Sequence, residues 1–162
     1  MDAFTFGSIV RFEDLKPGNF FISSWNDKAV FGIAAKFQKD DGIYCAMFNP
    51  PVDGKGFDVD SFASHESVWR IEGAIFRPKI DPGALQLAVQ IAIGRLILAA
   101  DGNYLVCRHG WNGAILRINL ENGTISSPAD PFVIVENWEI GILNSKTNEW
   151  HVVYEHVTRL TE

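Results

Sequence analysis

Short runs of β-branched and aromatic residues, cut at intervals by turn pairs, extend through this chain from Phe20 to Val157. The turn pairs are Asn26-Asp27, Asp41-Gly42, Asp101-Gly102 and Asn122-Gly123, and a further turn falls at 144–148. Such side chains suit a pleated, half-buried surface, and Asp-Gly or Asn-Gly supplies the positive φ of a tight hairpin. The pattern predicts a mainly β protein, an antiparallel sandwich or barrel-like sheet of short hairpin-linked strands.

The alternation also predicts where the strands lie and which faces they bury. We expect strands at about 19–25, 29–38, 43–48, 68–76, 95–100, 103–109, 114–120, 132–136, 138–143 and 150–157. Within 68–76, Trp69 and Ile71 share one face and Arg70 points to the other, as in a strand with one side on a core. Trp138 begins a similar run. We therefore predict that Trp69 and Trp138 are both buried.

The segment 82–93 fits two patterns. Asp81-Pro82 resembles a helix N-cap followed by proline at the first helical position. Leu85, Val89 and Ile93 recur at helical spacing, but the odd-numbered residues 85–93 are also all apolar, as in a strand. The cap and the helix-forming residues favour a helix at about 82–93, and we expect no other.

Length and composition indicate a single compact domain spanning 1–162. The 162 residues are 47% hydrophobic, which is enough for a substantial core. A faint echo suggests an alternative organisation, because Asp41-Gly42-Ile43-Tyr44 recurs as Asp101-Gly102-Asn103-Tyr104, and 69–75 recurs shortened as 138–142. An internal duplication with two similar halves, at about 19–80 and 84–160, would explain the echo.

Charge and hydropathy exclude several classes of partner. Twenty acidic residues oppose fourteen basic ones, giving a net charge of −6 without a cluster of Lys and Arg. We therefore expect no nucleic-acid binding. The longest apolar stretch, 85–100, is short and interrupted by polar residues, so we expect no membrane span. A cytoplasmic protein follows, with Cys45 and Cys107 as reduced thiols.

No complete catalytic set, cofactor motif or metal-ligand spacing is present, so we expect no cofactor and no metal. Cys107 and His109 share a strand face, about 6.6 Å apart at Cα, which is wide for a direct thiol–imidazole bond. A hydrolase using Cys107 with a nearby histidine or carboxylate remains an alternative function. An irregular metal site formed by Asp53, Asp58 and Asp60 is a further alternative, although their spacing is not that of an EF-hand loop.

The clearest functional indication is Trp111, within the predicted hairpin tip Gly110-Trp111-Asn112-Gly113 and beside Arg108 and His109. Exposed Trp and Arg are enriched at binding hot spots. The alternative is that the indole folds back over the end of the core. We expect a soluble, non-enzymatic module that binds a protein or a small-molecule ligand through Trp111, His109 and Arg108. A subunit of a homo-oligomer is the other alternative.

Overall fold

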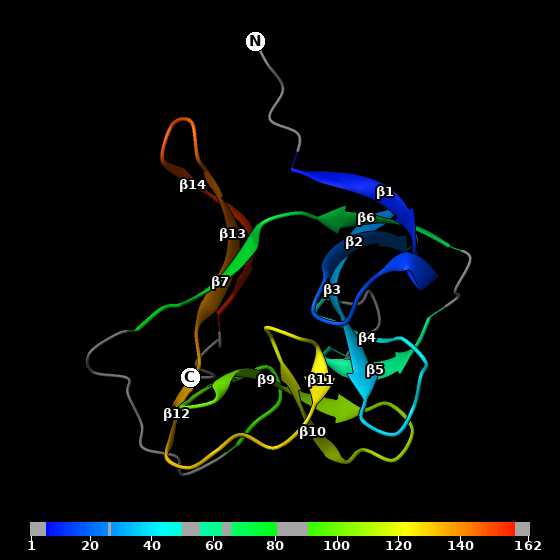
Figure 1. Cartoon of the computed structure of the whole chain (residues 1–162), viewed down its shortest axis with the longest axis vertical. Helices are drawn as coiled ribbons and strands as arrows, with labels where there is room; N and C mark the ends of the chain where they lie inside the picture. Colours follow the sequence, from blue (N-terminus) through cyan, green and yellow to red (C-terminus); the bar gives the residue numbers. More distant parts are fainter. Residues whose placement is uncertain (1–5, 26, 50–55, 63–65, 81–90, 158–162) are drawn as a thin grey trace.

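The computed structural model describes residues 6–25, 27–49, 56–62, 66–80 and 91–157 (Figure 1). Within these ranges the chain forms strands, one short 3-10 helix η1 (Phe12–Asp14) and no α-helix. The strands are β1 (Gly7–Arg11), β2 (Phe20–Trp25), β3 (Lys28–Phe37), β4 (Tyr44–Met47), β5 (Asp58–Ser61), β6 (Ser67–Ile71), β7 (Ala74–Pro78), β8 (Leu96–Ala99), β9 (Gly102–His109), β10 (Ile115–Asn119), β11 (Thr124–Ile125), β12 (Phe132–Val135), β13 (Trp138–Asn144) and β14 (Glu149–His156). The predicted mainly β architecture is confirmed.

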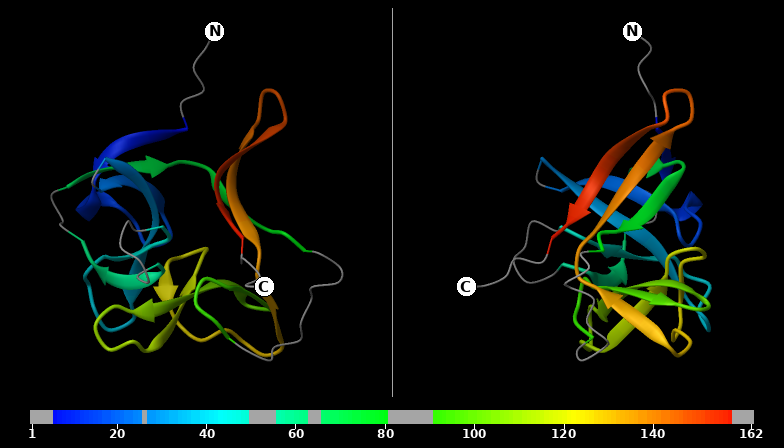
Figure 2. Two further views of the ribbon diagram at one scale, coloured as in Figure 1. Left: turned by 180° about the vertical axis from the view of Figure 1, so that it is seen from behind. Right: turned by 90° about the vertical axis from the view of Figure 1, so that its left-hand side faces the viewer.

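Two sheets make up the fold. The larger follows the order β1-β6-β2-β3-β11-β10-β9-β5-β4, with β8 and β12 branching from β9. Because β3 also pairs with β4, the strands β3-β11-β10-β9-β5-β4 close into a barrel-like circuit. The smaller sheet, β14-β13-β7, stands beside it (Figure 2). Among the described residues, all pairings are antiparallel except β5 with β9 and β11 with β3.

The main hydrophobic core lies between the two sheets. Ile33, Leu105 and Ile118 reach it from the larger sheet, and Trp138 and Ile140 reach it from the smaller one. A second cluster packs residues around η1 against the opposite face of β3 and β4; it contains Phe12, Leu15, Phe21, Ala34, Cys45 and Val68. Strand β3 is therefore buried on both faces, which explains why few polar residues interrupt its sequence.

The same scheme of strand pairing occurs twice in the chain. The pairs β2–β3, β3–β4, β4–β5 and β2–β6 have counterparts in β8–β9, β9–β10, β10–β11 and β8–β12. The halves also exchange strands, because β5 pairs with β9 while β11 pairs with β3. The pairings thus have an approximate two-fold symmetry, and a single domain built from two similar halves stays a prediction.

The symmetry passes through the ladder between β7 and β13. Phe37 pairs with Ile125 as His109 pairs with Val59, so Phe37 and His109 are equivalent. The registers of the neighbouring strands then make Ile71 equivalent to Val135. Val135 follows Ile71 by 64 residues, and Ile140 follows Phe76 by the same 64 residues. Phe76 and Ile140 are also paired with each other. An antiparallel pair of equivalent residues can occur only at the symmetry axis, which therefore lies between them.

The sequence echo did not match equivalent elements. Asp41-Gly42 lies between β3 and β4, whereas Asp101-Gly102 lies between β8 and β9, whose counterparts are β2 and β3. Trp69 lies in β6, whereas Trp138 lies in β13, the counterpart of β7. The two halves therefore share a scheme of strand pairing. The similar sequence motifs lie in strands that are not equivalent under that scheme.

The predicted single strand at 68–76 is wrong. The chain turns at Glu72-Gly73, where Gly73 has φ of +69°, so β6 joins the larger sheet and β7 the smaller one. The expected burial of Trp69 is wrong too, because 40% of this residue is exposed. Its indole lies over Gly7 of the edge strand β1, which has no side chain to displace it. Trp138 is fully buried, as predicted.

Three short strands, β1, β5 and β11, were not predicted from the sequence. The predicted helix at 82–93 falls mostly on 81–90, which lie outside the described residues. Its described end, 91–93, is not helical. There Ile91 and Ile93 pack against a third cluster that contains Ile97 and Tyr104. In the part of the chain that the structure describes, no helix has the length and apolarity to cross a bilayer.

Candidate functional site: the β9–β10 tip

The candidate site is the tip of the β9–β10 hairpin, residues Gly110–Gly113. Backbone bonds close it, from His109 N–H to the Ala114 carbonyl (2.8 Å) and from Gly113 N–H to the His109 carbonyl (2.9 Å). Gly113 has φ of +71°, a conformation that glycine adopts without strain. The Asn112 side chain accepts a further bond from Ala114 N–H at 3.0 Å. These local bonds make the tip a defined loop.

Strand β5 fixes the base of the tip to the barrel. Gly110 N–H donates to the Val59 carbonyl at 2.9 Å, and Arg108 N–H donates to the Phe57 carbonyl at 3.0 Å. These bonds belong to the parallel β5–β9 pairing, one of the two places where the halves exchange strands. The tip is thus held from both sides, by β10 and by β5.

Arg108 forms an ion pair with Asp58 of β5. Its Nε and one terminal nitrogen both contact Oδ1 of Asp58, at 2.8 and 2.7 Å. The two side chains are partly buried, which strengthens the pair relative to a fully solvated one. Arg108 therefore stabilises the β5–β9 contact below the tip, and its guanidinium is already engaged with a carboxylate.

His109 lies between the tip and an aromatic row. Its Nδ1 accepts a hydrogen bond from Trp111 N–H at 3.2 Å, which requires that this nitrogen carry no proton. On the other side its ring is 5.7 Å from Phe37, and Phe37 is 5.0 Å from Tyr44. The Tyr44 hydroxyl donates to Asp40, and this bond lowers the pKa of Asp40 below its usual value.

The Trp111 side chain stands almost entirely in solvent. The residue is 93% exposed, the most exposed of the large apolar residues in the described ranges. The alternative in which the indole folds back over the core is therefore wrong. Neighbouring Ile115 is 45% exposed and adds apolar surface at the base of the tip. A loop held by these bonds that presents one large aromatic ring can insert this ring into a recess of a partner.

Cys107, the proposed nucleophile of the hydrolase alternative, is fully buried. Burial raises the pKa of its thiol, and the negative charge of Asp58 raises it further. Burial also raises the pKa of Cys45 to about 12. Nucleophilic cysteines need a thiolate that substrates can reach. The environment of Cys107 is that of a structural thiol in the main core.

The acidic residues 53, 58 and 60 do not form a metal site among the described residues. Asp53 lies outside the described ranges, Asp58 is paired with Arg108, and the Asp60 carboxylate lies beside Gly110. No group of three or more potential ligand side chains is found in the part of the chain that the structure describes.

A second exposed apolar surface lies at the other end of the larger sheet. Ile9 of β1 is 72% exposed and pairs with Trp69 of β6, which in turn pairs with Ile22 of β2. Phe6 packs against Trp69, with ring centroids 6.3 Å apart. We call Phe6, Ile9, Ile22 and Trp69 the Trp69 row.

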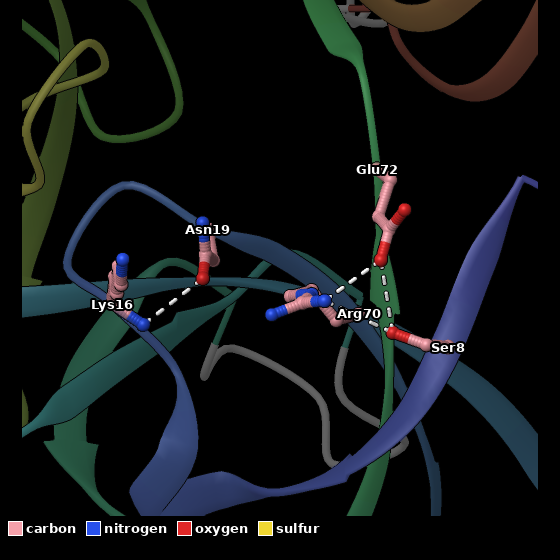
Figure 3. Close-up of polar contacts among 5 residues, drawn as sticks. All are labelled: Ser8, Lys16, Asn19, Arg70 and Glu72. Atoms are coloured by element: carbon pink, nitrogen blue, oxygen red, sulfur yellow. Dashed lines mark hydrogen bonds and ion pairs between the residues drawn. The ribbon is translucent and has the colours of Figure 1, made fainter.

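Polar contacts that join Ser8, Arg70 and Glu72 hold β1 against β6 (Figure 3). Arg70 donates to Ser8 Oγ at 3.2 Å and to Glu72 Oε1 at 2.7 Å, and Ser8 donates to the same Glu72 oxygen at 3.0 Å. The bond from Arg70 lowers the pKa of Glu72. The exposed edge of the large sheet is therefore an ordered strand.

A scan against protein-family models, a search of curated proteins and a search of solved structures each find no match to this chain. The site must therefore be interpreted from its own geometry.

Sequence reasoning located Arg108, His109 and Trp111 but missed their neighbours. Asp58, Phe37 and Tyr44 come from β5, β3 and the start of β4, and only the barrel closure brings them to the tip. The short run Asp58–Ser61 carries one apolar residue, Val59, so its periodicity gave little sign of a strand. The exposed Trp69 row was missed because sheet position, which periodicity does not encode, decides its exposure.

Proposed function

We propose that this chain is a non-enzymatic binding module that docks a protein partner through the β9–β10 tip, with Trp111 as the anchor. The observation that carries the proposal is the 93% exposure of Trp111 on a loop fixed by backbone hydrogen bonds. Tryptophan is the residue type most enriched at binding hot spots, where it fills a pocket of the partner. A small-molecule ligand remains the alternative, without a specific observation in its favour.

The rigidity of the tip favours binding. Ordering a flexible loop on association costs free energy, and a loop that is already ordered avoids that cost. The bonds from the tip to β5, β10 and the His109 ring all exist in the free chain. Asp60, whose carboxylate lies beside Gly110, adds an exposed negative charge at the base of the tip. The matching partner surface is an apolar recess with a basic group at its rim.

The test uses a photo-crosslinking amino acid at the exposed position 114, three residues after Trp111, in the full chain, because this position contributes only backbone bonds to the tip. The probe is exposed to lysate of the source cells, and the crosslinked proteins are identified with and without the additional change Trp111→Ala. We expect a discrete crosslinked protein that disappears with Trp111→Ala. Leu143→Ala, which truncates a 46% exposed leucine on the other sheet, serves as a matched control and should leave the crosslink intact.

A crosslink that persists in Trp111→Ala, or that Leu143→Ala removes equally, would show that the tip is not the docking element. The purified partner should then be titrated against both variants. Loss of a hot-spot tryptophan weakens binding by about 2 kcal/mol or more, roughly thirtyfold in Kd.

The proposal includes a cytoplasmic location, which the two free thiols Cys45 and Cys107 support.

The assembly alternative keeps one specific observation, the exposed Ile9 and Trp69 at the β1 end of the larger sheet. Sedimentation separates the two functions. A concentration-dependent dimer that Trp69→Ala dissociates would favour the assembly subunit, and a monomer would favour the binding module.

A further inference from the structure

We infer that the free edge of β7 is a second binding site, which accepts an extended partner peptide in the way that β13 accepts β14. The inference comes from the approximate two-fold symmetry, under which β7 and β13 are equivalent. Strand β13 carries β14 on the side away from β7. Strand β7 has no strand partner on its equivalent side within the described ranges (Figure 2, right).

The hydrogen-bonding groups on this edge follow from the ladder register. Lys79 N–H donates to the Asn137 carbonyl at 2.9 Å, so residues 79, 77 and 75 direct their N–H and C=O groups toward β13. The N–H and C=O groups of Ala74 and Phe76 therefore point away from β13. Pro78 presents a carbonyl but has no N–H, so the edge supports a short added strand and disfavours continued sheet growth.

The surface beneath this edge is apolar. Phe76 contacts Phe20 of β2 at 5.9 Å between ring centroids, and Ile22 stands two residues further on the same face of β2. Ile22 continues through its partner Trp69 to Ile9. An extended peptide on β7 would thus direct alternate side chains toward Phe76 and the Trp69 row.

Comparison of the two halves places the difference between them at the edge of the small sheet. The counterparts of Phe20, Ile33 and Ile71 are Leu96, Leu105 and Val135. All six residues are at most 6% exposed, whereas Trp69, two positions before Ile71, is 40% exposed. In the second half the end of β14 packs inward, with His156 against Trp138 and Phe57. The first half has no described strand in the position of β14.

The strand β14 also indicates the chemistry of the occupant. Tyr154 and Val153 turn toward the core, and Glu155 binds Lys79 on the outer face. Next to the free edge, the outer face carries Arg77, whose side chain is 61% exposed and lies 3.9 Å from Glu139. A carboxylate on the added strand beside Arg77 would complement this charge. The fitting partner is an extended peptide segment with apolar residues on one side and acidic residues on the other.

The test uses a fluorescein-labelled synthetic peptide with the sequence of residues 149–156, added to the isotope-labelled full chain. We expect saturable binding by fluorescence anisotropy. The largest amide shifts should be those of Ala74 and Phe76, with smaller ones at Trp69. A peptide of the same composition in scrambled order should bind at least about tenfold more weakly, because the alternation would be lost.

Two variants address the edge and one addresses the tip. Ala74→Pro removes a free-edge donor without removing a bond to β13, and Arg77→Glu reverses the local charge. Each should weaken peptide binding by about tenfold or more, which corresponds to a lost charge-assisted or backbone hydrogen bond. Trp111→Ala should leave peptide affinity within about twofold, so this test and that of the proposed function fail independently. Denaturation curves verify that each variant is folded.

Several outcomes would overturn the inference. The absence of binding, or equal binding to Arg77→Glu, would show that the edge does not select this peptide. Amide shifts at Ile140 and Ile142 without shifts at Ala74 and Phe76 would show that the peptide displaces β14. Sedimentation of the free chain as a dimer that Ala74→Pro dissociates would show that a second copy of the chain occupies the edge.

Discussion

The indole of Trp150 lies directly over Gly141, which follows the Ile140 of the symmetry axis. A Cβ at position 141 would lie 2.5 Å from Cε2 of that ring and 2.7 Å from the His151 carbonyl oxygen. In this position Trp150 donates its Nε1–H to the buried Glu139 carboxylate at 2.7 Å, and Arg77 stacks on the ring at 5.3 Å. The absent side chain of Gly141 thus allows the outer face of the small sheet to bury a carboxylate.

We therefore predict that Gly141→Ala destabilises the protein by about 1–3 kcal/mol, the usual cost of inserting a methyl group into a tightly packed site. Urea denaturation monitored by circular dichroism provides the measurement. Gly42→Ala is the matched control, because its nearest neighbour is the end of the Asp40 side chain at 3.2 Å. The same free-energy cost of Gly141→Ala in a Trp150→Ala background would show that the indole is not the obstacle.

Trp138→Ala should destabilise the protein by about 3–5 kcal/mol, as truncation of a fully buried tryptophan typically does. Its Nε1–H also donates to the Gly94 carbonyl at 2.7 Å, and the truncation would leave that buried acceptor without this donor. Trp69→Ala should cost clearly less, because the ring is 40% exposed at the sheet edge. Denaturant midpoints of the two variants test this, and equal losses of stability would contradict it.

Trp111→Ala should change the free energy of unfolding by no more than about 0.5 kcal/mol, as expected at a surface position. The prediction separates a displayed ring from a structural one. It is measured by thermal or urea denaturation, with Trp138→Ala as the destabilised reference. A loss above about 2 kcal/mol would show that the indole packs on the protein in solution.

Cys107 and Cys45 should react with a thiol reagent at pH 8 about a hundredfold or more slowly in the native chain than in the unfolded chain. The reason is that burial denies access to the reagent and raises the pKa of both thiols. The time course of absorbance with a chromogenic disulfide measures the two rates. Fast modification of Cys107 in the native chain would restore support for the hydrolase alternative.

Stability should fall as the pH is lowered from about 7.5 to about 5.5, and His156 should account for part of the loss. Burial lowers the pKa of His156 below its ordinary value of 6.5, so the unfolded state binds a proton more readily than the folded state. Protonation therefore favours unfolding as the pH drops through that range. His156→Phe keeps an aromatic ring against Trp138 and removes the titration.

Denaturation midpoints at several pH values, compared between the wild type and His156→Phe, test this expectation. The variant should show a smaller fall in stability over the same interval. His151→Phe, at an exposed position of the same strand, controls for the loss of a histidine that is not buried. Parallel curves for the wild type and His156→Phe would rule out a contribution from His156.

The tip site illustrates how far the sequence could predict function. Gly110 and Gly113 around Trp111 predict a loop, and the flanking apolar residues predict its two strands, because both signals are local. The ion pair between Arg108 and Asp58 joins residues 50 positions apart. Only the parallel addition of β5 to β9 brings them together, and no local pattern specifies that pairing.

The sequence by itself determined most of the longer strands and many of their turns, because side-chain alternation and glycine-containing turns act over a few residues. It did not determine that Trp69 is exposed while Trp138 is buried, although both begin apolar alternations. Tertiary structure decided this difference. Trp69 lies near an edge of the large sheet, over the glycine of β1, whereas Trp138 lies between the two sheets with β7 and β14 on either side. Burial depends on what packs against a residue from elsewhere in the chain, and periodicity reports only which side of a strand it occupies.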